Sequence, residues 1–188
     1  TLSGYYTDAE EALDQAMIQA VSISTTAGFA TTDFASWPSF LPIMLIFASF
    51  IGGCAGSTGG GLKVIRVFLL FLQGKREIDR LIHPKAVYAV KLGERAMPDR
   101  VVEAVWGFFS AYAIVFVVIM IGLIATGLDN LTAFTATAAT LNNLGPGLGS
   151  VATTYAEVTD GGKWLLVTAM LFGRLEVFSL LVLFSPTF

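Results

Sequence analysis

The run from Ala104 to Ile124 constrains the fold most, because it holds no charged residue over twenty-one positions. As a helix it would extend about 31 Å, enough to cross the ~30 Å hydrocarbon core of a bilayer. Hydrophobic residues make up 55% of the chain and charged residues only 13%, whereas soluble domains carry about a quarter. The sequence therefore predicts a membrane protein, with Trp106 near the cytoplasmic end of this helix.

The charges are segregated along the chain. Nine of the eleven basic residues lie between Lys63 and Arg100, and acidic residues dominate both flanks. The positive-inside rule places this basic connector in the cytoplasm and both acidic ends outside. A nucleic-acid patch is the alternative, but a position between two membrane segments favours topology, and we expect no nucleic-acid partner. The single cysteine, Cys54, excludes an internal disulfide framework.

Two short loops look alike, at Thr25–Phe29 and, 117 positions later, at Asn142–Pro146. In each, small or polar residues after a short helical stretch lead up to a glycine. Glycine tolerates positive φ and leaves a pore lumen open, and inward-facing carbonyls can replace the hydration shell of K⁺. The first helix, capped by Thr7 or Asp8, ends at Ser24, so that its carbonyl end favours a cation at the loop. The alternative is an ordinary amphipathic helix followed by a Thr/Gly turn.

A glycine-rich run interrupts the next apolar segment. Leu41–Ile51 and Val64–Leu72 flank Gly52–Gly61, which contains six glycines in ten residues. Each glycine costs a helix about 1 kcal/mol relative to alanine, so we expect a helix broken near the middle of the membrane, which is tolerated where it lines a cavity. A phosphate loop and a dinucleotide fingerprint are both excluded, because Gly61 is followed by Leu62-Lys63-Val64.

The last predicted span, Trp164–Phe184, contains Arg174 and Glu176. An arginine at that depth costs ~3 kcal/mol or more and should face a pore or the protein interior. The alternative role is a structural strut that pairs with carbonyls freed by the glycine run. Smaller expectations are a second amphipathic helix with Leu131, Phe134, Thr135, Ala138 and Ala139 on one face, an interfacial Trp37, and a weak strand at Ala86–Val90 paired near Ala96.

The order of these motifs resembles the TrkH/KtrB superfamily of potassium transporters over essentially the whole chain. The most specific part is Gly-Gly-Cys-Ala-Gly-Ser-Thr-Gly-Gly-Gly-Leu-Lys at 52–63. The resemblance implies an all-α membrane protein with four helix–pore-loop–helix repeats around a pseudo-fourfold pore. We then expect a fragment of a longer protein: residues 1–75 form the third repeat without its first helix, 76–100 a cytoplasmic connector, and 101–188 the fourth repeat.

The resemblance also implies site residues. The K⁺ selectivity filter would include Thr25, Thr26, Ala27, Gly28, Asn142, Asn143, Leu144 and Gly145. The gate would be the loop of Gly52, Gly53, Gly56, Ser57, Thr58, Gly59, Gly60 and Gly61, with Arg174 beside it. K⁺ would be the substrate, held by backbone carbonyls, and we expect no organic cofactor, catalytic residue or enzyme activity. The fourth filter departs from the third, with Asn-Asn-Leu-Gly-Pro-Gly in place of Thr-Thr-Ala-Gly-Phe-Ala.

The implied partners are the remaining repeats of the pore, a second copy of the pore subunit, and a cytoplasmic nucleotide-binding regulatory ring of the RCK/TrkA type. The implied location is the inner (plasma) membrane. Three alternatives stay open: the K⁺-translocating subunit of a P-type pump, a secondary transporter that binds a small solute at the broken helix, and a structural scaffold. The solute transporter predicts inverted repeats, whereas both loops here run in the same direction.

Overall fold

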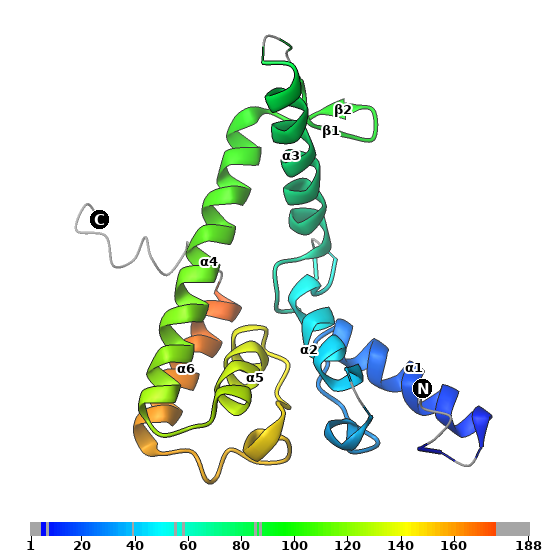
Figure 1. The fold of residues 1–188 in the computed structure, drawn as a ribbon, viewed down its shortest axis with the longest axis vertical. Helices are drawn as coiled ribbons and strands as arrows, with labels where there is room; N and C mark the ends of the chain where they lie inside the picture. Colours follow the sequence, from blue (N-terminus) through cyan, green and yellow to red (C-terminus); the bar gives the residue numbers. More distant parts are fainter. Residues whose placement is uncertain are drawn as a thin grey trace.

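The computed structural model describes residues 5–6, 8–38, 40–54, 56–57, 59–84, 86 and 88–175, and these are almost entirely helical (Figure 1). Thr58 of the predicted gate, Glu176 and the second half of the predicted last span lie outside the described residues. The elements, in chain order, are α1 (Ala9–Ser24), η2 (Phe34–Ser36), α2 (Leu41–Ile51), α3 (Val64–Ile82), β1 (Lys91–Leu92), β2 (Arg95–Ala96), α4 (Asp99–Ala125), α5 (Asn130–Leu141), η3 (Gly149–Val151) and α6 (Asp160–Arg174).

Side-chain caps explain where the short helices begin. Asp8 accepts a hydrogen bond from the Glu10 amide at α1, and Asp129 accepts one from the Thr132 amide at α5. Thr159 caps α6 through the Gly162 amide. These bonds satisfy backbone donors that the first helical turn leaves unpaired. The predicted start and end of the first helix are therefore confirmed.

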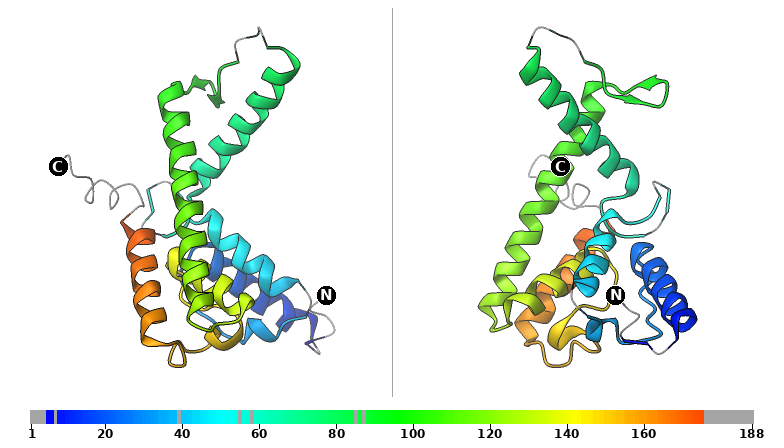
Figure 2. Two further views of the ribbon diagram at one scale, coloured as in Figure 1. Left: turned by 60° about the vertical axis from the view of Figure 1, so that its left-hand side comes forward. Right: turned by 45° about the vertical axis from the view of Figure 1, so that its right-hand side comes forward.

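Helix α3 crosses α4 and packs against it through Leu69, Val102 and Val105, and α5 lies among the remaining helices toward the other end of the molecule (Figures 1 and 2). Helix α5 packs against α2, α4 and α6, while α1 packs against α2. One apolar cluster joins α1, α2 and the loop after α5, through Ile23, Ile46 and Leu144 among others. A second joins α4, α5 and α6 around Leu123 and Ala136. Helix α5 thus forms the centre of the chain.

The described residues contain one helix long and apolar enough to cross a membrane, α4, with mean hydropathy 2.6 in its best window. Helix α2 is shorter and also apolar. It ends at Gly52, whose φ of 65° is incompatible with a continuing helix. The predicted break between two apolar segments is therefore confirmed.

Three expectations need correction. Helix α5 is buried on nearly all sides rather than amphipathic, because Thr135, Thr137 and Thr140 return their hydroxyls to carbonyls of their own helix. Trp37 is buried and donates its indole N–H to the Tyr6 hydroxyl, so its ring packs inside the protein instead of facing lipid headgroups. The strand lies at Lys91–Leu92, after the predicted segment, because the turn at Gly93 joins only two residues on each side. Helix α3 also runs through the charged residues 76–80, so the expected division at residue 75 falls within one continuous helix.

Candidate functional site

The loop after α1 has the backbone that the sequence led us to expect. Gly28 has a φ of +79°, in the left-handed region. The Ala27 amide bonds the Ser22 carbonyl at 2.8 Å, and the Thr26 amide bonds Ile23 at 3.1 Å. Thr26 also has a positive φ, of 57°, which is an outlier for a β-branched residue. Strain of this kind persists where the surrounding structure fixes it, and it concentrates at functional sites.

The loop after α5 repeats this backbone residue by residue. Gly145 has a φ of +104° and Asn143 one of +53°, at the positions equivalent to Gly28 and Thr26. The Leu144 amide bonds the Ala139 carbonyl at 2.7 Å, and the Asn143 amide bonds Thr140 at 3.0 Å. The two loops therefore share one local structure. The sequence similarity suggested the glycines, but it gave no sign that Thr26 and Asn143 share a strained conformation.

The two loops lie against each other. A Cβ built on Gly28 would overlap the carbonyl oxygen of Leu144 and contact the ring of Pro146. Nothing lies within 4 Å of a Cβ built on Gly145, so that position faces open space. The structure thus brings all eight predicted filter residues into two adjoining stretches of irregular backbone, 25–28 and 142–145. These stretches are not β-strands, and we call them the predicted filter strands. Only a glycine at position 28 permits this approach.

The glycine-rich loop packs directly against these strands. The Gly60 amide donates to Thr26 Oγ1 at 3.1 Å, and a Cβ on Gly60 would overlap the carbonyl of Asn142. A Cβ on Gly59 would lie 3.3 Å from the Thr25 carbonyl oxygen. Contact between the loop and both filter strands therefore requires glycine at position 60.

The base of the glycine-rich loop is closed by backbone hydrogen bonds. The Leu62 amide bonds the Phe50 carbonyl at 2.8 Å, and the Val64 amide bonds Gly53 at 3.2 Å. Gly52 and Gly61 have φ values of 65° and 77°. A Cβ built on either residue would overlap a backbone carbonyl on the opposite side of the loop base. Gly56 faces open space, and Ser57 donates its hydroxyl to the Cys54 carbonyl at 2.8 Å. The loop is fixed at its base and is held at its far side by Gly59 and Gly60.

A buried hydrogen-bond chain holds the start of the second filter strand. The Tyr112 hydroxyl of α4 donates to Asn142 Oδ1 at 2.5 Å, and Asn142 Nδ2 donates to Ser49 Oγ at 2.8 Å. Ser49 donates in turn to the Ile46 carbonyl of α2 at 2.6 Å. The Asn142 side chain therefore links α4 to α2. Sequence reasoning missed Tyr112 and Ser49, although they are rare polar groups in apolar helices.

Tyr155, in the loop before α6, holds the glycine of the second strand. Its hydroxyl donates to the Gly145 carbonyl at 2.7 Å. Burial raises the pKa of Tyr155 to about 12, so the hydroxyl keeps its proton at neutral pH. Sequence reasoning missed this residue as well, because the loop from Val151 to Gly162 carries no pattern that relates it to position 145.

A cavity of about 180 Å³ lies beside the glycine-rich loop. Gly59, Gly61 and Ser57 line it together with three basic side chains, Lys63, Arg66 and Arg174. Lys63 donates to the Ser57 carbonyl at 3.0 Å, and the Arg66 guanidinium lies 4.2 Å from the centre of the Phe108 ring. The predicted proximity of Arg174 to the glycine run is therefore present in the structure, and Lys63 and Arg66 add to its positive potential.

Arg174 lies close to the end of the part of the chain that the structure describes. It is the last residue of α6, and Leu175 caps that helix. The adjacent Gly173 lies against the Leu141 carbonyl, where a Cβ would overlap that oxygen. This contact holds the end of α6 against the end of α5.

The amino-acid sequence matches known membrane transport proteins over nearly its whole length. Residues 5–187 match the family model for TrkH, described as a cation transport protein. The chain belongs to the TrkH family. It is 68% identical over 183 residues to the Trk system potassium uptake protein TrkH of Vibrio parahaemolyticus, and 62% identical to that of Escherichia coli. In each case the match covers 97% of this chain and 38% of the relative.

The fold also matches a solved TrkH-family structure. The crystal structure of the potassium transporter TrkH from Vibrio parahaemolyticus superimposes with a TM-score of 0.90 at 67% identity. It covers 97% of this chain, which in turn spans 39% of that protein. The predicted helical membrane fold is therefore confirmed. The names of these relatives describe transport proteins, as expected, and not enzymes.

The chemistry available to this TrkH-family chain rests on its backbone. Among the described residues, no group of three His, Cys, Asp or Glu side chains could hold a metal ion. The adjoining strands at 25–28 and 142–145 instead offer peptide carbonyls, which are hard oxygen ligands suited to an alkali cation.

Proposed function

We propose that the chain supplies two of the four filter strands of a potassium uptake protein. K⁺ sheds water at residues 25–28 and 142–145 and is coordinated by their carbonyls. The observation that carries this proposal is the shared backbone of the two strands, with positive-φ glycines at Gly28 and Gly145 and direct contact between the strands. Two strands enclose half of a fourfold ring, so the remaining repeats must complete it.

The glycine-rich loop acts as the gate in this proposal. It lies against both filter strands through Gly59 and Gly60, and the basic side chains of Lys63, Arg66 and Arg174 line the cavity beside it. A cation leaving the filter meets backbone and positive charge there. Displacement of the loop would remove this obstruction and increase the separation between the passing ion and the three basic side chains. Residues Gly52, Gly53, Gly56, Ser57 and Gly61, with Thr58, complete the loop.

The assembly follows from the same proposal. The chain divides into the third repeat (1–75), a cytoplasmic connector (76–100) and the fourth repeat (101–188). The complete pore subunit forms a homodimer in the inner membrane and is regulated by a nucleotide-binding ring of the RCK/TrkA type. The names of the relatives, which refer to a Trk system, are consistent with additional subunits.

Gly145→Ser tests the filter in the complete protein. At a φ of +104° a side chain strains the strand and enters the open space beside it, so we expect the preference for K⁺ over Na⁺ to fall about tenfold. The measurement is uptake of tracer Rb⁺ and Na⁺ into liposomes. Gly127→Ser is the matched control, because Gly127 has a φ of +98° and open space around it but lies in the outer turn after α4. Equal selectivity in both variants would refute the filter.

A further inference from the structure

The cytoplasmic end of α3 carries a second basic cavity, separate from the pathway. It measures about 170 Å³ and lies between α3 and the segment that enters β1. Lys75, Arg76 and Asp79 line one wall, and Tyr88 and Lys91 line the other. At about 30 Å³ per water, this volume equals roughly five or six waters, which is enough for a phosphate group.

Buried contacts fix both walls. Val90 packs with Leu69 of α3 and with Val102 and Val105 of α4 in one apolar cluster. The Met97 amide bonds the Val90 carbonyl at 2.8 Å, which closes the base of the hairpin. The cavity is therefore a formed feature of the fold, with Tyr88 and Lys91 held opposite α3.

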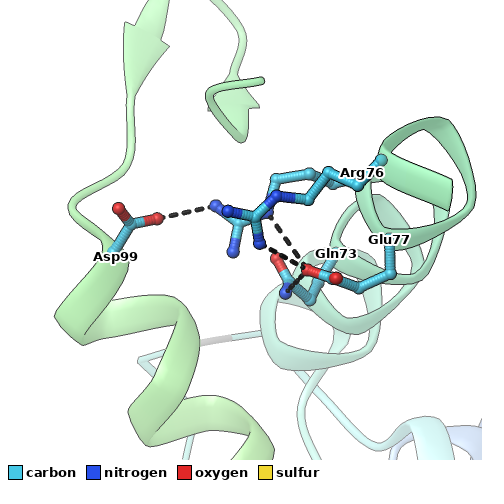
Figure 3. Close-up of polar contacts among 5 residues, drawn as sticks. Gln73, Arg76, Glu77 and Asp99 are labelled. Atoms are coloured by element: carbon cyan, nitrogen blue, oxygen red, sulfur yellow. Dashed lines mark hydrogen bonds and ion pairs between the residues drawn. The ribbon is translucent and has the colours of Figure 1, made fainter. Parts of the chain in front are cut away.

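Arg76 lines this cavity, and its guanidinium reaches toward Asp99 of α4 and Glu77 of α3 (Figure 3). Its side chain is only 10% exposed, and its Nη1 lies 2.6 Å from Asp99 Oδ1 of α4. Its buried Nε–H lacks a hydrogen-bond partner among the described residues, since Glu77 Oε1 lies 3.7 Å away. A buried guanidinium donor without an acceptor is costly. An oxygen of a ligand in the cavity would supply that acceptor.

The charge of the cavity favours an anion. Lys75 and Lys91 make no ion pair within the part of the chain that the structure describes, and Asp79 is the only carboxylate of the lining. Arg76 is already balanced by Asp99. The two lysines therefore leave the cavity with a net positive charge, next to donors that can bond several oxygens of one phosphate.

The depth of the cavity identifies the source of the phosphate. The uncharged part of α4 starts at Ala104, five residues or about 7 Å after Asp99. Headgroups occupy about 5–7 Å outside each face of the hydrocarbon core. Because Arg76 contacts Asp99, it lies at the headgroup level, on the side that the basic connector assigns to the cytoplasm. Tyr88, with an apolar ring and a polar tip, suits the same level.

We propose that this cavity binds the phosphate of an anionic phospholipid of the inner leaflet, with Lys75, Arg76 and Lys91 as its donors. Basic pockets at the cytoplasmic ends of membrane helices suit such headgroups. The bound lipid would fix the hairpin against α3, whose first residues follow the glycine-rich loop. The inference concerns binding alone and does not depend on potassium transport.

The test uses the complete protein in detergent, titrated with phosphatidylglycerol or phosphatidylcholine and followed by native mass spectrometry. We expect one site that prefers phosphatidylglycerol, and we expect the double variant Lys75→Gln/Lys91→Gln to weaken it about thirtyfold. Arg95→Gln is the matched control, since it removes one charge from the same hairpin outside the cavity lining.

Inorganic phosphate, added as a competitor, separates the two sources of the ligand. Little displacement at millimolar phosphate supports a lipid site. Full displacement, with equal affinity for both lipids, would assign the cavity to a soluble phosphate and overturn the proposal. The proposal also fails if the double variant binds phosphatidylglycerol as the unchanged protein does, or if Arg95→Gln loses as much affinity.

Discussion

Gly60→Ala is expected to raise the resting K⁺ flux of the complete protein about tenfold or more. The new methyl group would overlap the Asn142 carbonyl, whose strand is anchored by the buried helix α5 and by Tyr112 and Ser49. The glycine-rich loop must therefore move away. Overpacking typically costs about 1–3 kcal/mol. Here it destabilises only the closed arrangement, in which the glycine-rich loop lies against the Asn142 carbonyl. The ratio of displaced to closed loop should therefore rise roughly five- to 150-fold. Rb⁺ efflux from loaded liposomes measures the change.

Gly56→Ala provides the matched control for this prediction. Gly56 belongs to the same loop, but a Cβ built there meets nothing within 4 Å. Its flux should stay within about twofold of the unchanged protein, since a surface change of this kind is nearly neutral. The gate assignment fails if Gly60→Ala assembles correctly and conducts no more than Gly56→Ala. It also fails if Gly60→Ala loses K⁺ selectivity, because the filter and not the loop would then have yielded.

Asn142→Leu is expected to lower the free energy of unfolding by about 2–4 kcal/mol. Leucine has a similar volume but leaves the buried Tyr112 hydroxyl without its acceptor and removes the donor to Ser49. The strand would lose its link to both α2 and α4, so selectivity should decline with stability. Titration with a denaturing detergent in mixed micelles measures the unfolding.

The double variant Asn142→Leu/Tyr112→Phe distinguishes this network from simple packing. Tyr112→Phe removes the stranded hydroxyl, so the double variant should recover about 1–2 kcal/mol of what Asn142→Leu loses. If the two single changes add without coupling, the hydrogen-bond chain does not hold the strand. Ser49 retains its bond to Ile46 in every variant.

Sequence periodicity and local chemistry predicted the elements of the fold well. The Asp8 cap, the break at Gly52 and the uncharged run within α4 are local signals, and the structure places each where it was expected. The errors arose where tertiary contacts decide. The apparent stripe on α5 gave no sign that helices surround it, and Trp37 is buried because Tyr6 offers its indole a partner.

The site was predictable to the same extent. Glycines that require positive φ can be recognised in a sequence, and so Gly28 and Gly145 were found. The groups that hold them could not be, because Tyr112, Ser49 and Tyr155 act through contacts that arise only from folding. The need for glycine at position 60 is likewise invisible in sequence, since it depends on the carbonyl of Asn142, which is distant along the chain.

The most direct test of the central claim is the position of the ion itself. Crystals of the complete protein grown with Tl⁺ in place of K⁺ would locate it by anomalous scattering. The account predicts peaks within coordination distance of carbonyl oxygens from residues 25–28 and 142–145, which weaken when K⁺ is added back. An ordered filter without such peaks, or peaks confined to side chains elsewhere, would contradict it.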